Sequence, residues 1–147
     1  MYSTKSNSIT VNVHLYQWHQ KTNLEVLIDC GTTDNFIDQR TVESLHIGTR
    51  LLPEPRLVRN VDGTPNKAGH ITRFANLTVR RGDKTVTLGF YVANLGRDRL
   101  ILGLPWLKVF NPTIDWSRLA LIGDDIHIKT AGYGRRKPKL NINTIRV

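Results

Sequence analysis

Short runs in which apolar and polar residues alternate, separated by turn-forming residues, constrain the fold of this chain more than any other feature. Residues 9–16 alternate Ile, Val, Val, Leu and Tyr with more polar neighbours, which is typical of a β-strand with one buried face. Arg81-Gly82-Asp83-Lys84 has the composition of a tight hairpin turn between two such runs. Further strands are predicted at residues 24–28, 57–61, 70–79, 85–92, 100–103, 113–116 and 119–122. The sequence therefore predicts a mainly β domain.

Two segments are predicted to form short helices. Residues 35–45 place apolar side chains at a weak helical spacing. Residues 104–110 follow a glycine and include Pro105, which the first turn of a helix tolerates because its N–H would have no partner there anyway. Asn111-Pro112 is expected to end this second helix.

The chain is expected to form one domain, because 147 residues can bury one sizeable core but not two. The domain is predicted to span residues 9–130, with a polar N-terminal extension at 1–8 and a basic tail or linker at 131–147. The net charge is +9, and its densest run, Arg135-Arg136-Lys137, lies in that tail. Nucleic acid is therefore expected only as the context in which the protein works.

No feature of the sequence points to secretion, a membrane or a metal. The first nine residues lack an apolar signal-peptide core, and no apolar stretch is long enough to cross a bilayer. The single cysteine, Cys30, excludes an internal disulfide and a cysteine-based zinc site. The histidines His14, His19, His46, His70 and His127 are scattered without the spacing of metal ligands. An intracellular, cytoplasmic protein without a metal or other cofactor is the expectation.

The segment Val26-Leu27-Ile28-Asp29-Cys30-Gly31-Thr32-Thr33 has the strongest chemical signal. Asp29 directly follows an apolar strand, so its carboxylate is expected at the rim of the core. Gly31 would let the chain turn tightly and bring backbone N–H groups towards the carboxylate, and the Thr32 hydroxyl could donate a hydrogen bond to it. Taken alone, Asp-x-Gly after a strand is more often an ordinary turn than a catalytic site. A second apolar run that ends in glycine, Ile101-Leu102-Gly103, favours the catalytic interpretation.

These two segments together resemble a known family. Leu27-Ile28-Asp29-Cys30-Gly31-Thr32 resembles the hydrophobic–hydrophobic–Asp–Thr/Ser–Gly–Ala/Ser/Thr signature of aspartic proteases, and Ile101-Leu102-Gly103 resembles the later hydrophobic–hydrophobic–Gly element of the retroviral type. Residues 98–107, followed by Asn111-Pro112 and Ile114-Asp115-Trp116, are similar to protease domains of gypsy-type LTR retrotransposons. The resemblance spans about residues 9–122.

The resemblance implies a closed retropepsin-like barrel with one short helix after the second motif, and Asp29 as the catalytic residue at the base of a substrate cleft. Cys30, Gly31 and Thr32 would form the active-site loop. A flap over the substrate would include Val61, Asp62, Gly63, Thr64 and Gly69. The retrotransposon family would place the protein in the cytoplasm or in retrotransposon particles.

A homodimer follows from the resemblance, because aspartic proteases use two carboxylates that share one proton. This chain has only one such motif, so Asp29 must face its own mate across a two-fold axis. The expected substrate is a polypeptide, first of all the parent polyprotein. Two positions depart from the retroviral pattern. Cys30 stands where Thr or Ser usually bonds across the dimer, and Thr32 stands where Ala is usual.

Two alternatives to a working protease remain at this point. One is a catalytically decayed or host-adopted module with the same fold that dimerises or binds a peptide. The departure at Cys30 leaves this alternative open, whereas intact Asp29 and Gly31 favour the working protease. The other is a basic nucleic-acid adaptor that acts through its tail, with binding that is sensitive to salt and indifferent to Asp29.

Overall fold

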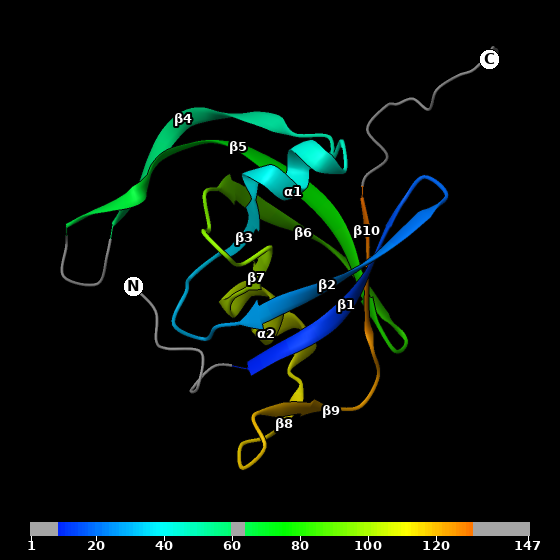
Figure 1. The fold of residues 1–147 in the computed structure, drawn as a ribbon. Helices are drawn as coiled ribbons and strands as arrows, with labels where there is room; N and C mark the ends of the chain where they lie inside the picture. Colours follow the sequence, from blue (N-terminus) through cyan, green and yellow to red (C-terminus); the bar gives the residue numbers. More distant parts are fainter. Residues whose placement is uncertain (1–8, 60–63, 131–147) are drawn as a thin grey trace, which may run out of the picture.

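The computed structural model describes residues 9–59 and 64–130; the predicted extensions at 1–8 and 131–147 lie outside this part of the chain. Figure 1 shows the ribbon, in which strongly curved strands surround the core and the two helices are short. The elements are β1 (Ile9–Gln17), β2 (Gln20–Ile28), β3 (Asn35–Asp38), α1 (Gln39–Ser44), β4 (Arg50–Arg59), β5 (Pro65–Arg81), β6 (Lys84–Ala93), β7 (Leu100–Leu102), α2 (Leu104–Phe110), β8 (Thr113–Asp115), β9 (Ala120–Ile122) and β10 (Ile126–Thr130).

The main sheet closes on itself. Its strand order is β10-β1-β2-β7-β3-β6-β5-β4, and β10 also pairs with β5. Because of this extra pairing, the strands from β10 to β5 form a closed barrel, while β4 is attached to the outside edge of β5. Strands β8 and β9 form a separate two-stranded sheet. The prediction of a closed, mainly β fold is confirmed.

Strand β7 lies between β2 and β3, although β2 and β3 are consecutive in the chain. On one side Leu27 pairs with Ile101 in parallel register. On the other side Phe36 pairs with the same Ile101 in antiparallel register. The loop of residues 29–34, which joins β2 to β3, must therefore cross the end of β7. This crossing brings the two sequence motifs together.

The interior of the barrel is filled by side chains from alternate strand positions, as the period-two pattern requires. Fully buried residues include Val13 and Leu15 of β1, Leu77 and Val79 of β5, and Ile126 and Ile128 of β10. Helix α2 adds Trp106, which is also fully buried. Each aliphatic side chain of this kind contributes about 1.5–3 kcal/mol through removal from water. No helix in the described part of the chain has the length and apolar character needed to span a bilayer.

Several predicted boundaries are wrong, for identifiable reasons. Residues 35–45 are not one helix, because residues 35–38 form β3 and only 39–44 are helical. Strand β4 begins well before residue 57 despite Pro53 and Pro55, which a strand paired on one side only can accept. Strand β10 was not predicted, although its buried residues alternate with residues that are partly or fully exposed. The hairpin turn between β5 and β6 and the helix at 104–110 are confirmed.

Candidate active site

Asp29 is held at the rim of the barrel by the strand beside it. It follows the last residue of β2, and its backbone N–H donates a hydrogen bond to the carbonyl oxygen of Leu102 at 3.0 Å. This bond continues the β2–β7 pairing one residue beyond the strand. The Asp29 side chain is half-buried, so its carboxylate lies where core and solvent meet, as the sequence predicts.

The candidate active-site loop orients the Asp29 carboxylate through one backbone contact. The N–H of Gly31 donates to Oδ1 of Asp29 at 2.8 Å. A Cβ at residue 31 would lie 3.1 Å from that same oxygen, a distance tighter than nine in ten real Cβ contacts. Glycine at this position therefore lets the backbone approach the carboxylate closely.

The Thr32 hydroxyl does not make the predicted bond to the carboxylate. Its Oγ1 donates instead to the backbone carbonyl oxygen of Asp29 at 3.0 Å, and the Thr32 N–H points to the same oxygen at 3.3 Å. A hydroxyl has one hydrogen to donate, so this contact replaces the expected one. Thr32 therefore closes the loop back on its start, while its own carbonyl accepts the N–H of Leu104 at 3.0 Å.

Gly103 is the contact point between the two motifs. A Cβ added there would lie 2.2 Å from the backbone oxygen of Asp34 and 2.5 Å from Oγ1 of Thr32. The Gly103 N–H donates to Oδ1 of Asn35 at 2.9 Å. The active-site loop is thus packed directly on the backbone of the second motif, and Ile101 and Leu102 bring that backbone there as part of β7.

Asn35 and Asp38 support the site and were not among the predicted residues. Asn35 is buried, and its amide N–H also points to the carbonyl of Gly89 at 3.5 Å. Asp38 is buried as well and accepts three hydrogen bonds through its carboxylate. The donors are the N–H of Leu95 at 2.9 Å, and the N–H and Nε of Arg40, both at 3.0 Å. Asn35 and Asp38 are both polar and flank the apolar pair Phe36-Ile37, which is the sequence signal that could have identified them.

Asp38 ties the start of α1 to the segment that leads into β7. It is the N-cap residue of α1, and its own N–H donates to the carbonyl of Arg99 at 3.0 Å. Nε of Arg99 donates to Oγ1 of the buried Thr41 at 2.8 Å, and Arg40 donates to the carbonyl of Gly96. These bonds fix the residues before β7, and with them the position of the second motif.

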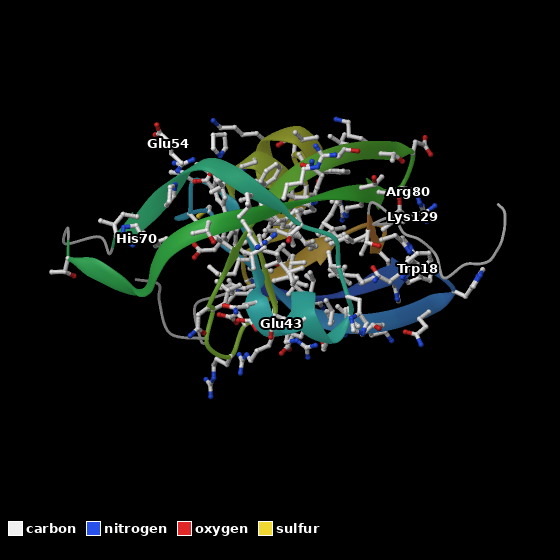
Figure 2. All side chains as sticks on the ribbon, turned by 90° about the horizontal axis from the view of Figure 1, so that it is seen from above. Trp18, Glu43, Glu54, His70, Arg80 and Lys129 are labelled. Atoms are coloured by element: carbon white, nitrogen blue, oxygen red, sulfur yellow. The ribbon has the colours of Figure 1, made fainter. Side chains whose placement is uncertain are left out.

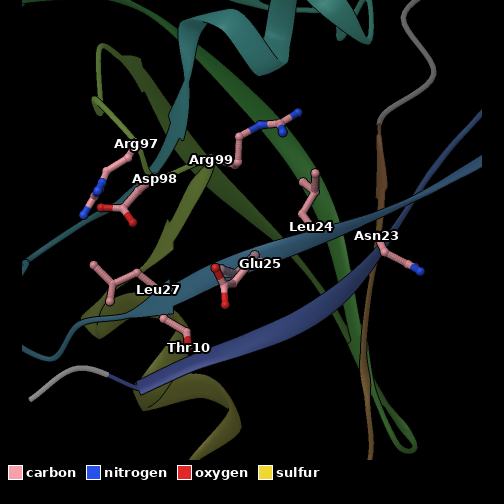
Figure 3. A pocket seen from close by; sticks show the side chains of 9 residues that line it. Thr10, Asn23, Leu24, Glu25, Leu27, Arg97, Asp98 and Arg99 are labelled. Carbon is pink, nitrogen blue, oxygen red and sulfur yellow. The ribbon is translucent and has the colours of Figure 1, made fainter. Parts of the chain in front are cut away.

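A polar cavity of about 260 Å³ lies between β2 and residues 97–99, which precede β7 (Figure 3). It is lined by Thr10, Asn23, Leu24, Glu25, Val26, Leu27, Arg97, Asp98 and Arg99. Acidic and basic residues share its wall, namely Glu25 and Asp98 with Arg97 and Arg99, and Asp29 is not among the lining residues.

The predicted flap corresponds to the β4–β5 hairpin, which projects from the barrel in Figure 1. Val61, Asp62 and Gly63 lie outside the described residues, and Thr64 is exposed beside them. Gly69 has a φ of 69°, in the left-handed region that favours glycine. Gly69 lies at a bulge in the strand pairing, where the segment of β5 contains more residues than the segment of β4 that pairs with it. Such a bulge bends the strand.

Cys30 is exposed on the active-site loop. The structure describes one copy of the chain, in which this thiol faces solvent beside Asp29. Within the described residues, no three His, Cys, Asp or Glu side chains lie together in a way that could hold a metal ion.

The chain is similar to the retroviral protease-like domain of Ddi1 from Leishmania major, with 18% identity over 88% of this chain and 98% of that one, and a TM-score of 0.45. The family assignment rests on a different comparison, in which residues 25–130 match the family model described as PEG10/RTL1 protease domain. That match runs from the middle of β2 to the end of β10 and includes both motifs of the site. The chain belongs to the PEG10/RTL1 protease domain family, which is retropepsin-like.

Proposed function

We propose that this protein is an aspartic endopeptidase that is active as a homodimer, with one Asp29 from each copy in a shared active site. The observation that carries the proposal is the placement of Asp29. Its carboxylate lies half-buried at the end of β2, oriented by Gly31, on a loop that is packed against Gly103. One hydrogen bond, from Gly31, reaches this carboxylate, and several others fix the loop that carries it. The Asp-x-Gly motif occurs once in the chain.

The proposed reaction is that of aspartic proteases in general. Two carboxylates a few ångströms apart cannot both ionise readily, so the pair shares one proton at mildly acidic pH. The ionised Asp29 takes a proton from a water molecule, whose oxygen attacks the scissile carbonyl carbon. The protonated Asp29 donates a hydrogen bond to the carbonyl oxygen. The C–N bond then breaks, and the leaving amine receives a proton from the Asp29 carboxyl that took one from the water.

The proposed substrate is a polypeptide, and first of all the polyprotein that contains the domain. This part of the proposal, with an origin in a gypsy-type retrotransposon, rests on the similarity of residues 98–116 to that group. The exposed β4–β5 hairpin would act as the flap that covers a bound peptide. Gly69, with its left-handed backbone, would supply the bend.

One observation favours a second candidate, a decayed or host-adopted module that dimerises or binds peptide without cutting it. Cys30 occupies the position where the family usually has a hydroxyl that bonds across the dimer. A thiol is a weaker donor and acceptor than a hydroxyl. A weaker contact at residue 30 would lower the fraction of the protein that is dimeric, and with it the fraction that has two carboxylates in one site.

The test is cleavage of a mixed peptide library at mildly acidic pH, with Asp29→Asn beside the wild type. Asp83→Asn is the matched control, because Asp83 is exposed in the β5–β6 turn outside the site. We expect cutting by the wild type and the control, loss of cutting in Asp29→Asn, and a steep fall in specific activity on dilution. Cutting that survives Asp29→Asn would overturn the proposal. A wild type that sediments as a dimer and cuts nothing would establish the second candidate.

A further inference from the structure

The outer surface of the barrel, away from Asp29, carries two rows of polar side chains that cross five neighbouring strands. The strand register places Asn23, His14, His127, Arg80 and Thr85 in one row, and Lys21, Tyr16, Lys129, Thr78 and Thr87 in the next. We call these ten residues the polar face. The residues between them along the strands, such as Leu15, Ile128 and Val79, are buried in the barrel, so the polar face points outward.

Three permanent positive charges lie on the polar face. Lys21, Arg80 and Lys129 come from β2, β5 and β10, and all three are exposed. Figure 2 shows Arg80 and Lys129 near Trp18, at the end of the molecule opposite Glu54 and His70. Among residues 9–59 and 64–130, no ion pair involves these three cations. A carboxylate reaches the face at its edge, where Asp125 lies 3.3 Å from Nε2 of His14.

The rings between these cations hold one another in place. His14 and His127 stack with their centroids 4.9 Å apart, and Tyr16 stacks on His127 at 5.8 Å. The Tyr16 hydroxyl and Nδ1 of His127 are 3.1 Å apart, and Nδ1 of His14 lies 2.9 Å from the side-chain oxygen of Asn23. The face is therefore ordered before any ligand arrives, which lowers the entropy lost on binding.

The chemistry of the polar face matches a phosphodiester chain. Its cations attract phosphate groups, and its hydroxyls, including the Thr78–Thr87 pair at 3.3 Å, can donate to phosphate and sugar oxygens. The two rows contain no aliphatic side chain that would insert into a lipid bilayer. A smooth sheet surface also offers no helix or ribbon to enter a duplex groove, so a single strand is the form it suits.

We propose that the polar face binds single-stranded nucleic acid through its phosphodiester backbone. Lys21 lies eight residues before Asp29 along β2, which corresponds to about 27 Å of extended strand. A strand bound at the polar face would therefore leave the candidate active site open. The proposal is independent of whether the protein cleaves peptides.

The test uses the full chain, including its basic tail, and a fluorescein-labelled single-stranded RNA of 15 nucleotides, about the upper end of a single-domain site. Fluorescence anisotropy would be measured across a series of NaCl concentrations, for the wild type and for the triple variant Lys21→Gln/Arg80→Gln/Lys129→Gln. For three phosphate contacts, the contribution of the face to the slope of log K against log salt is about −2. We expect the triple variant to bind at least about tenfold more weakly at low salt, and to lose that part of the slope.

The matched control removes the same charge elsewhere. Arg50→Gln/Lys108→Gln/Arg118→Gln changes three exposed cations of β4, α2 and the β8–β9 turn. It should bind RNA nearly as the wild type does, and both variants should keep the wild-type melting temperature. Equal weakening in the two triple variants would overturn the proposal, because net charge alone would then explain binding. Wild-type binding by the polar-face variant would also overturn it, because the tail would then be the site.

Two further probes separate the sources of anionic ligand. Single-stranded DNA of the same sequence should bind comparably, because phosphate is the recognised group. Vesicles that contain phosphatidylserine should not compete with the RNA. Competition by the vesicles that the polar-face substitutions abolish would overturn the assignment to nucleic acid in favour of a membrane surface.

Discussion

The backbone oxygen of Asp34 occupies the space that a side chain at Gly103 would need, since an added Cβ would lie 2.2 Å from that oxygen. The obstacle is backbone, which cannot rotate away as a flexible side chain can. The contact joins the loop after β2 to the residue after β7. The loop that carries Asp29 is therefore packed directly on the glycine of the Ile101-Leu102-Gly103 motif.

Gly103→Ala should destabilise the fold through this contact. The methyl group would push the loop of residues 29–34 away from β7, and overpacking of this kind costs about 1–3 kcal/mol. Gly89→Ala is the matched control, because its added Cβ would meet nothing closer than 3.7 Å. Urea denaturation would compare the free energies of unfolding. Equal stability of Gly103→Ala and the wild type would contradict the contact.

Asn35→Ala should weaken the same junction from the other side. The substitution would leave the N–H of Gly103 without the Asn35 oxygen that it contacts at 2.9 Å in a buried setting. An unpaired buried donor costs about 1–3 kcal/mol. Asn94→Ala removes a comparable side-chain to backbone bond, to the N–H of Gly96, at an exposed position and should cost less. A larger loss in Asn94→Ala than in Asn35→Ala, again by urea denaturation, would refute this assignment.

The sequence predicts the geometry of the loop after β2 well, because that geometry is local. Asp29, Gly31 and Thr32 are neighbours in the chain, and an apolar strand that ends in Asp-x-Gly already implies a tight turn at the rim of a core. The predicted hydrogen bond of the Thr32 hydroxyl is wrong. The sequence does not distinguish between the carboxylate and the backbone carbonyl of Asp29 as its acceptor, and the structure shows the carbonyl. The closed barrel was predicted through the resemblance to a family and not from the strand pattern itself.

The supporting residues could not be predicted, because their role depends on segments far away in the chain. Asn35 matters through Gly103, and Asp38 through the N–H of Leu95 and the carbonyl of Arg99. A polar residue in a short apolar run is compatible with a turn, a cap or a buried network. In the structure Asn35 belongs to a buried network, and Asp38 is both a helix cap and part of such a network. Both roles depend on the insertion of β7 between β2 and β3, which the sequence does not reveal.

The stability of the protein should fall as the pH drops below about 6.5, partly through His127. Burial lowers the pKa of His127, and the nearby charges of Arg80, His14 and Lys21 lower it further, against an opposing effect of Asp125. The unfolded chain, with a histidine pKa of about 6.5, therefore takes up the proton first. Stability is highest above that value and decreases until the folded pKa has also been passed.

His127→Gln should remove part of this loss, because glutamine does not titrate. The measurement is the difference in urea midpoint between pH 7.5 and pH 5.5, for the variant and the wild type. His19→Gln, at an exposed position of the β1–β2 turn, is the control and should retain the wild-type pH dependence. An unchanged difference in His127→Gln would contradict the attribution. His127 lies on β10, which closes the barrel between β1 and β5.

Cys30→Ser should strengthen the proposed homodimer. Cys30 is exposed on the loop that follows Asp29. The resemblance to retroviral aspartic proteases implies a hydroxyl at this position that bonds across the two-fold axis. A hydroxyl is the better donor and acceptor, and a typical hydrogen bond contributes about 0.5–1.5 kcal/mol net. Because a two-fold axis repeats every contact, the gain is counted twice, which corresponds to a dimer dissociation constant lower by about 5- to 150-fold. Sedimentation velocity across a dilution series measures it directly.

Cys30→Ala separates this hydrogen-bonding effect from mere removal of the thiol. Alanine has neither donor nor acceptor, so its dimer should be no tighter than that of the wild type. If the serine gain appears, the concentration at which peptide cleavage falls to half should shift down by a similar factor, because only the dimer has both carboxylates. A serine variant that dimerises more tightly without any cleavage would mean that the defect lies beyond Cys30, in the placement of Asp29 or of the flap. A serine variant no tighter than the alanine variant would show that residue 30 does not bond across the dimer.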